Sequence, residues 1–143
     1  MATQMQEVDS LVANEFSVEL DGVAVSGVFS VVGLTLFELD DNGERIKPAI
    51  TITKMVQRDN SLPFNQWHQE TMASRNADTH PTRELAVVAI DDGVETRRWT
   101  LQGAYITAIS YSNYDTGLSD MVEECYTIAY EEIEERWAYA DAE

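Results

Sequence analysis

The chain has 143 residues, of which 44% are hydrophobic and 24% charged, so it is long enough to bury roughly two thirds of its unfolded surface in one core. This composition excludes collagen-like, low-complexity and wholly disordered chains, and a lone cysteine excludes an internal disulfide. The net charge of −17, from 26 acidic and nine basic residues, disfavours nucleic-acid binding through a basic surface.

The acidic surface also bears on the environment in which the protein works. Only Lys47 and Lys54 are lysines, and salt screens the self-repulsion of so many carboxylates, so a halophilic source is expected. An acidic protein from an ordinary-salt environment is the alternative. Apolar runs fall far short of the roughly 20 residues of a membrane-spanning helix, and Glu7 and Asp9 interrupt the place of a secretory signal. We therefore expect neither a membrane span nor Sec-type export.

Alternation of apolar and polar residues, or a short buried apolar run, predicts the strands. They cover residues 15–20, 23–25, 29–36, 50–53, 85–90, 94–101, 105–111 and 122–130. Asp21-Gly22 and Asp92-Gly93 each predict a tight hairpin turn, because glycine adopts positive φ without strain.

A single helix is predicted at residues 62–74. Ser61 is a plausible N-cap, Pro63 stands in the first turn, and Phe64, Trp67 and Met72 fall near one face of a 3.6-residue period.

No internal repeat or second composition regime is visible, so residues 1–143 are predicted to form a single domain. Residues 1–14 would be an N-terminal arm, and residues 131–143 an acidic C-terminal tail that could fray. The predicted fold class is mainly β: an antiparallel β-sandwich or partly closed barrel with one short flanking α-helix.

Residues suited to catalysis are few. His68 lies in the predicted helix, His80 precedes a proline, and Cys125 has no cationic neighbour in sequence to lower its pKa. Adjacent acidic residues, as in Glu123-Glu124, point to opposite faces of a strand rather than converging on a substrate. The sequence thus predicts no enzyme, catalytic residue, cofactor or metal site, and a small carboxylate-dependent hydrolase would need a convergent acid pair that it does not show.

Five blocks of the sequence, in order, resemble the tail-tube proteins of phages, archaeal tailed viruses and contractile injection systems, a family that is also similar to the Hcp tube protein of type VI secretion. The blocks are residues 16–23 and 27–34, residues 48–58, residues 62–67 with Trp67, residues 98–105 with Trp99, and residues 122–134.

The resemblance implies a tail-tube (Hcp-like) fold and a structural role: stacked hexameric rings whose subunits pool their strands into one barrel around a conduit. It implies as partners other copies of the chain and sheath, baseplate or tail-terminator proteins, with DNA or protein cargo passing transiently and no membrane. The expected location is a virion tail or an extracellular injection particle, assembled in the host cytoplasm. A negative conduit wall would repel phosphate or acidic cargo.

The loop at residues 38–47 is the expected contact between rings, because its length is otherwise unexplained. Its residues are Glu38, Leu39, Asp40, Asp41, Asn42, Gly43, Glu44, Arg45, Ile46 and Lys47. A mobile hairpin loop without a partner is the alternative. For the whole chain, the alternative function is a monomeric acidic β-barrel binding module that holds a small or peptide ligand on a concave face.

Overall fold

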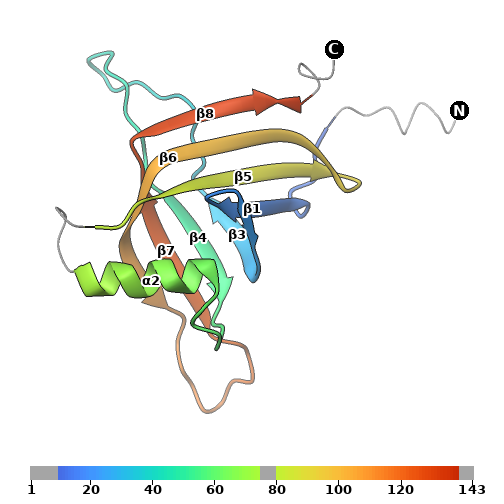
Figure 1. The fold of residues 1–143 in the computed structure, drawn as a ribbon, viewed down its shortest axis with the longest axis vertical. Coiled ribbons are helices and arrows are strands. Elements are labelled where there is room, and N and C mark those ends of the chain that lie inside the picture. The colour runs from blue at the N-terminus through green and yellow to red at the C-terminus, as the bar shows by residue number, and fades with distance from the viewer. Residues whose placement is uncertain (1–9, 75–79, 139–143) are drawn as a thin grey trace, which may run out of the picture.

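The computed structural model describes residues 10–74 and 80–138, which form an eight-stranded antiparallel sheet, strongly bent, with a helix packed on it (Figure 1). In chain order the elements are β1 (Phe16–Leu20), β2 (Val23–Val25), β3 (Val28–Val32), β4 (Ile50–Met55), α2 (Pro63–Ser74), β5 (Arg83–Asp91), β6 (Val94–Tyr111), β7 (Glu123–Ala129) and β8 (Glu132–Trp137). The strand order is β2-β1-β5-β6-β7-β4-β3, and β8 pairs with β6. The predicted class, mainly antiparallel β with a short flanking helix, is confirmed.

The bend divides the sheet into two layers that share β6. The first layer consists of β2, β1, β5, the first part of β6 and β8. The second layer consists of β3, β4, β7 and the last part of β6, from Tyr105 onward. Side chains from both layers and from α2 form one buried cluster between them.

The extent of strand β6 differs from the prediction. Residues 94–101 and 105–111 were expected as separate strands with a turn between them, but they belong to one strand of 18 residues. At the bend Gly103 has a φ of 64°, and a side chain there would collide with Glu131. The chain bends at Gly103 without ending the strand, because the residues on both sides of the bend are paired with neighbours.

The hairpin turns are confirmed. Asp21 and Gly22 have φ values of 49° and 84°, and Asp92 and Gly93 have values of 50° and 79°. Both pairs thus adopt the left-handed conformation of a two-residue hairpin turn, which glycine tolerates without cost and aspartate tolerates better than most residues.

The helix lies where the sequence predicts it, but two details of that prediction are wrong. The Ser61 hydroxyl does not cap the helix; it donates to the Asp59 carboxylate at 2.6 Å, and the same oxygen accepts the Ser61 N–H at 2.9 Å. Met72 is 54% exposed, whereas Phe64 and Trp67 are buried. The buried face of the helix is therefore confined to its first half.

The C-terminal segment differs from the expected acidic tail. Residues 132–137 form β8, whose register with β6 runs from Glu132 beside Gln102 to Trp137 beside Arg97. An acidic segment can pair here because alternate positions bury Ile133 and place Glu135 within reach of the Trp99 indole N–H, at 2.9 Å. Residues 1–9 of the expected arm and residues 139–143 lie outside the described residues. No described helix is long and apolar enough to cross a membrane.

Candidate assembly surfaces

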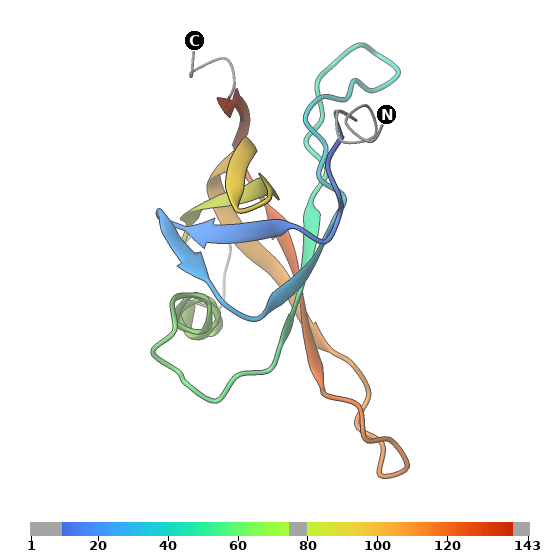
Figure 2. The same cartoon turned by 90° about the vertical axis from the view of Figure 1, so that its right-hand side faces the viewer.

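The second layer has one face against the core and one face toward solvent. Helix α2 lies on its core side, and Figure 2 shows no described helix or strand over the opposite side, here called the open face. Strand register assigns to the open face two rows of four side chains, flanked by the pairs Met55–Glu123 and Tyr105–Ala129. The first row is Val32, Thr51, Thr127 and Ala108, and the second is Ser30, Thr53, Cys125 and Ser110.

The edges of the second layer lack partners among the described residues. At one end β3 pairs with β4 on one side only. At the other end, β6 pairs with β5 only as far as Ala104, so residues 105–111 have an open edge on that side. Unpaired strand edges present rows of N–H and C=O groups that favour pairing with another chain. The second layer is thus a sheet of four strands that can be extended at both ends.

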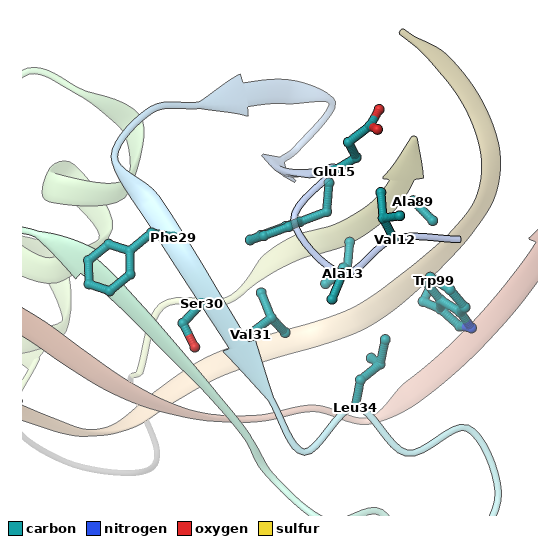
Figure 3. Close-up of a pocket in the computed structure, with 11 residues that line it drawn as sticks. Val12, Ala13, Glu15, Phe29, Ser30, Val31, Leu34, Ala89 and Trp99 are labelled. Atoms are coloured by element: carbon teal, nitrogen blue, oxygen red, sulfur yellow. The ribbon is translucent and has the colours of Figure 1, made fainter. Parts of the chain in front are cut away.

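An apolar groove of about 360 Å³ lies at the open edge of β3 (Figure 3). It is bounded by residues before β1, by β3 and by the inner side of β5 and β6, and its lining includes Val12, Val31, Leu34 and Trp99. Phe29, on the same edge strand, is 46% exposed. A strand added beside β3 would therefore bring its side chains to an apolar surface.

The predicted contact loop, residues 38–47, is brought together as a folded hairpin that projects from one end of the molecule (Figure 2). Leu39 and Arg45 form a β-bridge, and the Asp40 carboxylate accepts the N–H groups of Asn42 and Glu44, both at 2.9 Å. Gly43 completes the turn with a φ of 80°. The loop is thus internally hydrogen-bonded, while all ten of its residues remain exposed.

Large apolar side chains on this hairpin, and Phe37 just before it, are exposed to solvent in the described part of the chain. Phe37, Leu39 and Ile46 are 65%, 48% and 38% exposed, respectively. The Arg45 guanidinium lies 5.9 Å from the centre of the Phe37 ring, and the Lys47 ammonium lies 3.6 Å from the Glu132 carboxylate. Lys47 thus contacts β8, whereas Arg45 contacts the residues that lead into the hairpin.

A second exposed apolar group, at residues 112–122, was missed by sequence reasoning. This loop projects from the end opposite to the hairpin (Figure 1), with Tyr114, Leu118 and Met121 at 79%, 57% and 68% exposure. The available signal was the presence of three large apolar residues in a segment otherwise rich in Ser, Asn and Asp. The molecule thus carries exposed apolar groups at both ends of the second layer.

Of the residues considered for catalysis, His68 and Glu124 come together, with His68 Nδ1 3.5 Å from the Glu124 carboxylate, whereas His80 and Cys125 make other contacts. His68 Nδ1 lies 2.7 Å from the Tyr126 hydroxyl, and the His80 ring stacks on Tyr105 with the ring centres 4.0 Å apart. The Cys125 sulfur accepts from the Thr53 hydroxyl at 3.8 Å. Glu123 is exposed and Glu124 buried, as expected for adjacent strand residues. Among the described residues, no three His, Cys, Asp or Glu side chains form a group that could hold a metal ion.

A buried ion pair beneath α2 was also missed. Lys54 Nζ lies 2.9 Å from the Glu124 carboxylate and donates to Asn65 Oδ1 of the helix, also at 2.9 Å, and the Lys54 and Glu124 side chains are 0% and 7% exposed. Burial, followed by the Glu124 charge, raises the pKa of Tyr126 above its ordinary value. The available signal was a charged residue at an inward position of each alternating strand. The cluster is closed to solvent, and it joins α2 to the second layer.

No protein-family model matches the sequence, and no curated protein matches it. Solved structures match the fold over nearly the whole chain. A chain from the sheath–tube complex of an extracellular contractile injection system (PVC), in its extended state, superposes with a TM-score of 0.72 at 14% identity, covering 96% of this chain and 98% of the other. A chain from the anti-feeding prophage cap, the tube-terminating cap, gives a TM-score of 0.73 at 15% identity, with coverages of 96% and 99%.

Hcp1 from Flavobacterium johnsoniae superposes with a TM-score of 0.56 at 15% identity, covering 85% of this chain and 94% of that one. The protein therefore has the Hcp-like fold that is found in contractile injection particles, and the resemblance predicted from the sequence is confirmed at the level of the fold.

Proposed function

We propose that this chain is a structural tube protein whose copies form hexameric rings that stack into the inner conduit of a contractile injection system or viral tail. The observation that carries the proposal is a near full-length match to chains of a sheath–tube complex, combined with a four-stranded layer that is open at both edges. The role is non-enzymatic and requires no cofactor, and the conduit passes DNA or protein cargo.

Lateral contacts in the ring join the edge of β3 in one copy to the free edge of β6, residues 105–111, in the next. Directions alternate across the layer, so β3 and β6 at its two ends run opposite to each other. A rotation about the ring axis preserves the direction of each strand, so neighbouring copies meet in antiparallel orientation and continue the sheet. Closure of the ring then leaves no free edge in the layer.

The groove beside β3 strengthens this contact. A neighbouring strand paired with β3 places its side chains over the apolar lining near Phe29 and Trp99, where burial of apolar area adds to the hydrogen bonds of the backbone. The groove also fits the alternative function, because a monomeric binding module would use the same apolar surface to hold a small or peptide ligand.

Contacts between rings use the hairpin at residues 38–47. It projects along the second layer and exposes apolar side chains beside its carboxylates, so packing against the next ring would bury surface that the isolated subunit leaves in water. By this arrangement the partners are other copies of the chain, with sheath, baseplate or terminator proteins at the outer surface and ends. The location is a tail or an injection particle, assembled in the host cytoplasm, and the acidic surface fits a source in concentrated salt.

Electron microscopy and sedimentation of matched variants test the proposal. Phe29→Asp introduces a charge at the β3 edge and should leave monomers, whereas Gln66→Asp, at an exposed position of α2, should assemble like the unmodified protein. Deletion of residues 40–44 should leave single rings but few tubes. A protein that stays monomeric at all concentrations and salt levels, but binds peptides in the groove, would support the binding module instead.

A further inference from the structure

Charge is distributed unevenly over the two outward faces of the bent sheet. On the first layer, register places Glu19, Arg98, Glu134 and Arg136 on the outward face, with Arg98 2.7 Å from Glu19. On the open face of the second layer, Glu123 is the only charged residue among the described strand positions. In a chain with 26 acidic residues, this face is depleted of charge although it is exposed to solvent.

The open face has neither the side chains of a buried interface nor those of an ordinary acidic surface. Thr51, Thr53 and Thr127 provide hydroxyl groups, and the other positions in the two rows are small except Val32 at the edge. Water hydrates hydroxyl groups. The large side chains of this face lie at its margins: Val32 at the β3 edge, Met55 at the end of β4, and Tyr105 at the bend of β6, where it stacks on His80. The two rows thus form a smooth, hydrated and uncharged strip, and the one charged strand residue of the face, Glu123, lies beyond them at the start of β7.

We propose that the open face lines the conduit and that its lining is close to electrically neutral, which suits cargo whose surface carries charges of both signs, as that of a folded protein does. The inference rests on the proposed function, because pairing at both edges of the second layer puts one of its faces inside the ring and α2 covers the other. It replaces the negative wall expected from the net charge alone.

A neutral wall matters because a conduit repeats its lining around each ring and along the tube. One exposed ion pair contributes little, but a fixed charge repeated at every subunit would bind oppositely charged groups at many points simultaneously. An acidic wall would retain basic patches on a protein cargo and a basic wall would retain acidic ones. Hydroxyl groups retain neither, so the cargo can slide.

A native cysteine on the open face allows its electrostatic potential to be measured. Cys125 is the only cysteine, and it lies in the second row between Thr53 and Ser110. It is half-buried on the open face, so small reagents can reach its sulfur without any substitution in the lining. The local potential can therefore be measured on the unmodified protein.

The test compares the rates at which a cationic and an anionic methanethiosulfonate label Cys125 in assembled tubes, each divided by its rate with free 2-mercaptoethanol. The thiolate fraction affects both rates equally and cancels in their ratio. A neutral wall predicts a ratio within about twofold of one, whereas a ratio above about tenfold in favour of the cation would overturn the inference. Thr53→Glu, which adds a carboxylate beside Cys125, is the positive control and should raise the ratio.

A bulky polymer-linked maleimide tests the location of the face independently. It should label Cys125 in dissociated subunits but not in intact tubes. A cysteine introduced by Gln66→Cys in a Cys125→Ser background, at an exposed position of α2, should serve as an outer-surface control that is labelled in both states. Labelling of Cys125 in tubes that microscopy shows to be intact would overturn the assignment of the open face and leave the tube role standing. Absence of rings and tubes would overturn both.

Discussion

The buried ion pair between Lys54 and Glu124 gives the sharpest prediction about stability. The Lys54 side chain is fully buried, and its ammonium is 2.9 Å from the Glu124 carboxylate and 3.2 Å from the Met55 carbonyl oxygen. Glu124→Gln keeps the shape but leaves the ammonium without a counter-ion. Because a buried charge that loses its partner retains its full desolvation cost, the substitution should lower the free energy of unfolding by about 3–5 kcal/mol.

Lys54→Met should also lower the free energy of unfolding, because the buried Glu124 carboxylate loses its ammonium partner and keeps only His68 Nδ1, at 3.5 Å, beside it. The double variant Lys54→Met/Glu124→Leu removes both charges and should be within about 2 kcal/mol of the unmodified protein, because replacement of a buried pair by apolar residues is often neutral or stabilising.

Urea unfolding of dissociated subunits, followed by tryptophan fluorescence at fixed salt, measures all four proteins. The slope of free energy against urea should be unchanged, so that shifts in the midpoint report stability alone. If each single variant costs less than about 1 kcal/mol, the value typical of surface pairs, the pair is hydrated in solution and the reasoning from burial is refuted.

Three further predictions concern aromatic packing, pH and salt. Trp67→Ala should cost about 3–5 kcal/mol in urea unfolding, because Trp67 is fully buried, and Trp99→Ala should cost less, because Trp99 lies partly open in the groove; equal costs would contradict this difference. The hydrogen bond from Arg98 lowers the pKa of Glu95. The stability that this bond contributes is therefore present above the unfolded pKa of about 4.3 and is lost as pH falls through the lower pKa of the folded protein. NMR titration should find the Glu95 pKa raised in Arg98→Gln, and an unchanged pKa would contradict the assignment. Raising salt from about 0.1 M to about 1 M shortens the screening length from about 10 Å to about 3 Å, so repulsion between the acidic subunits should weaken. Light scattering should then show that assembly increases with salt. Tubes that are equally stable at low salt would show that charge repulsion does not limit assembly.

Sequence reasoning singled out one of the candidate assembly surfaces, the loop at residues 38–47. Residues 38–47 were singled out by loop length alone, and the structure places them in a projecting hairpin; their contact with another ring stays a prediction. The open face could not be found in the same way. Its neutrality depends on register, which decides that Thr53, Cys125 and Ser110 share a row although they come from three separate strands.

What the sequence determined by itself was local. Alternating residues set the strands, Asp21-Gly22 and Asp92-Gly93 set the turns, and Pro63 set the helix start, because each signal acts within a few residues of backbone.

What the tertiary structure alone decided was which distant segments meet. Gly103 bends β6 without ending it, because β5 pairs with the strand before the bend and β7 after it. Residues 132–137 form a strand because β6 offers them an edge. Lys54 and Glu124 are 70 residues apart in the sequence, and they are buried as a pair because β4 and β7 are neighbours in the sheet. Such choices depend on pairing and burial across the whole chain, which no short stretch of sequence contains.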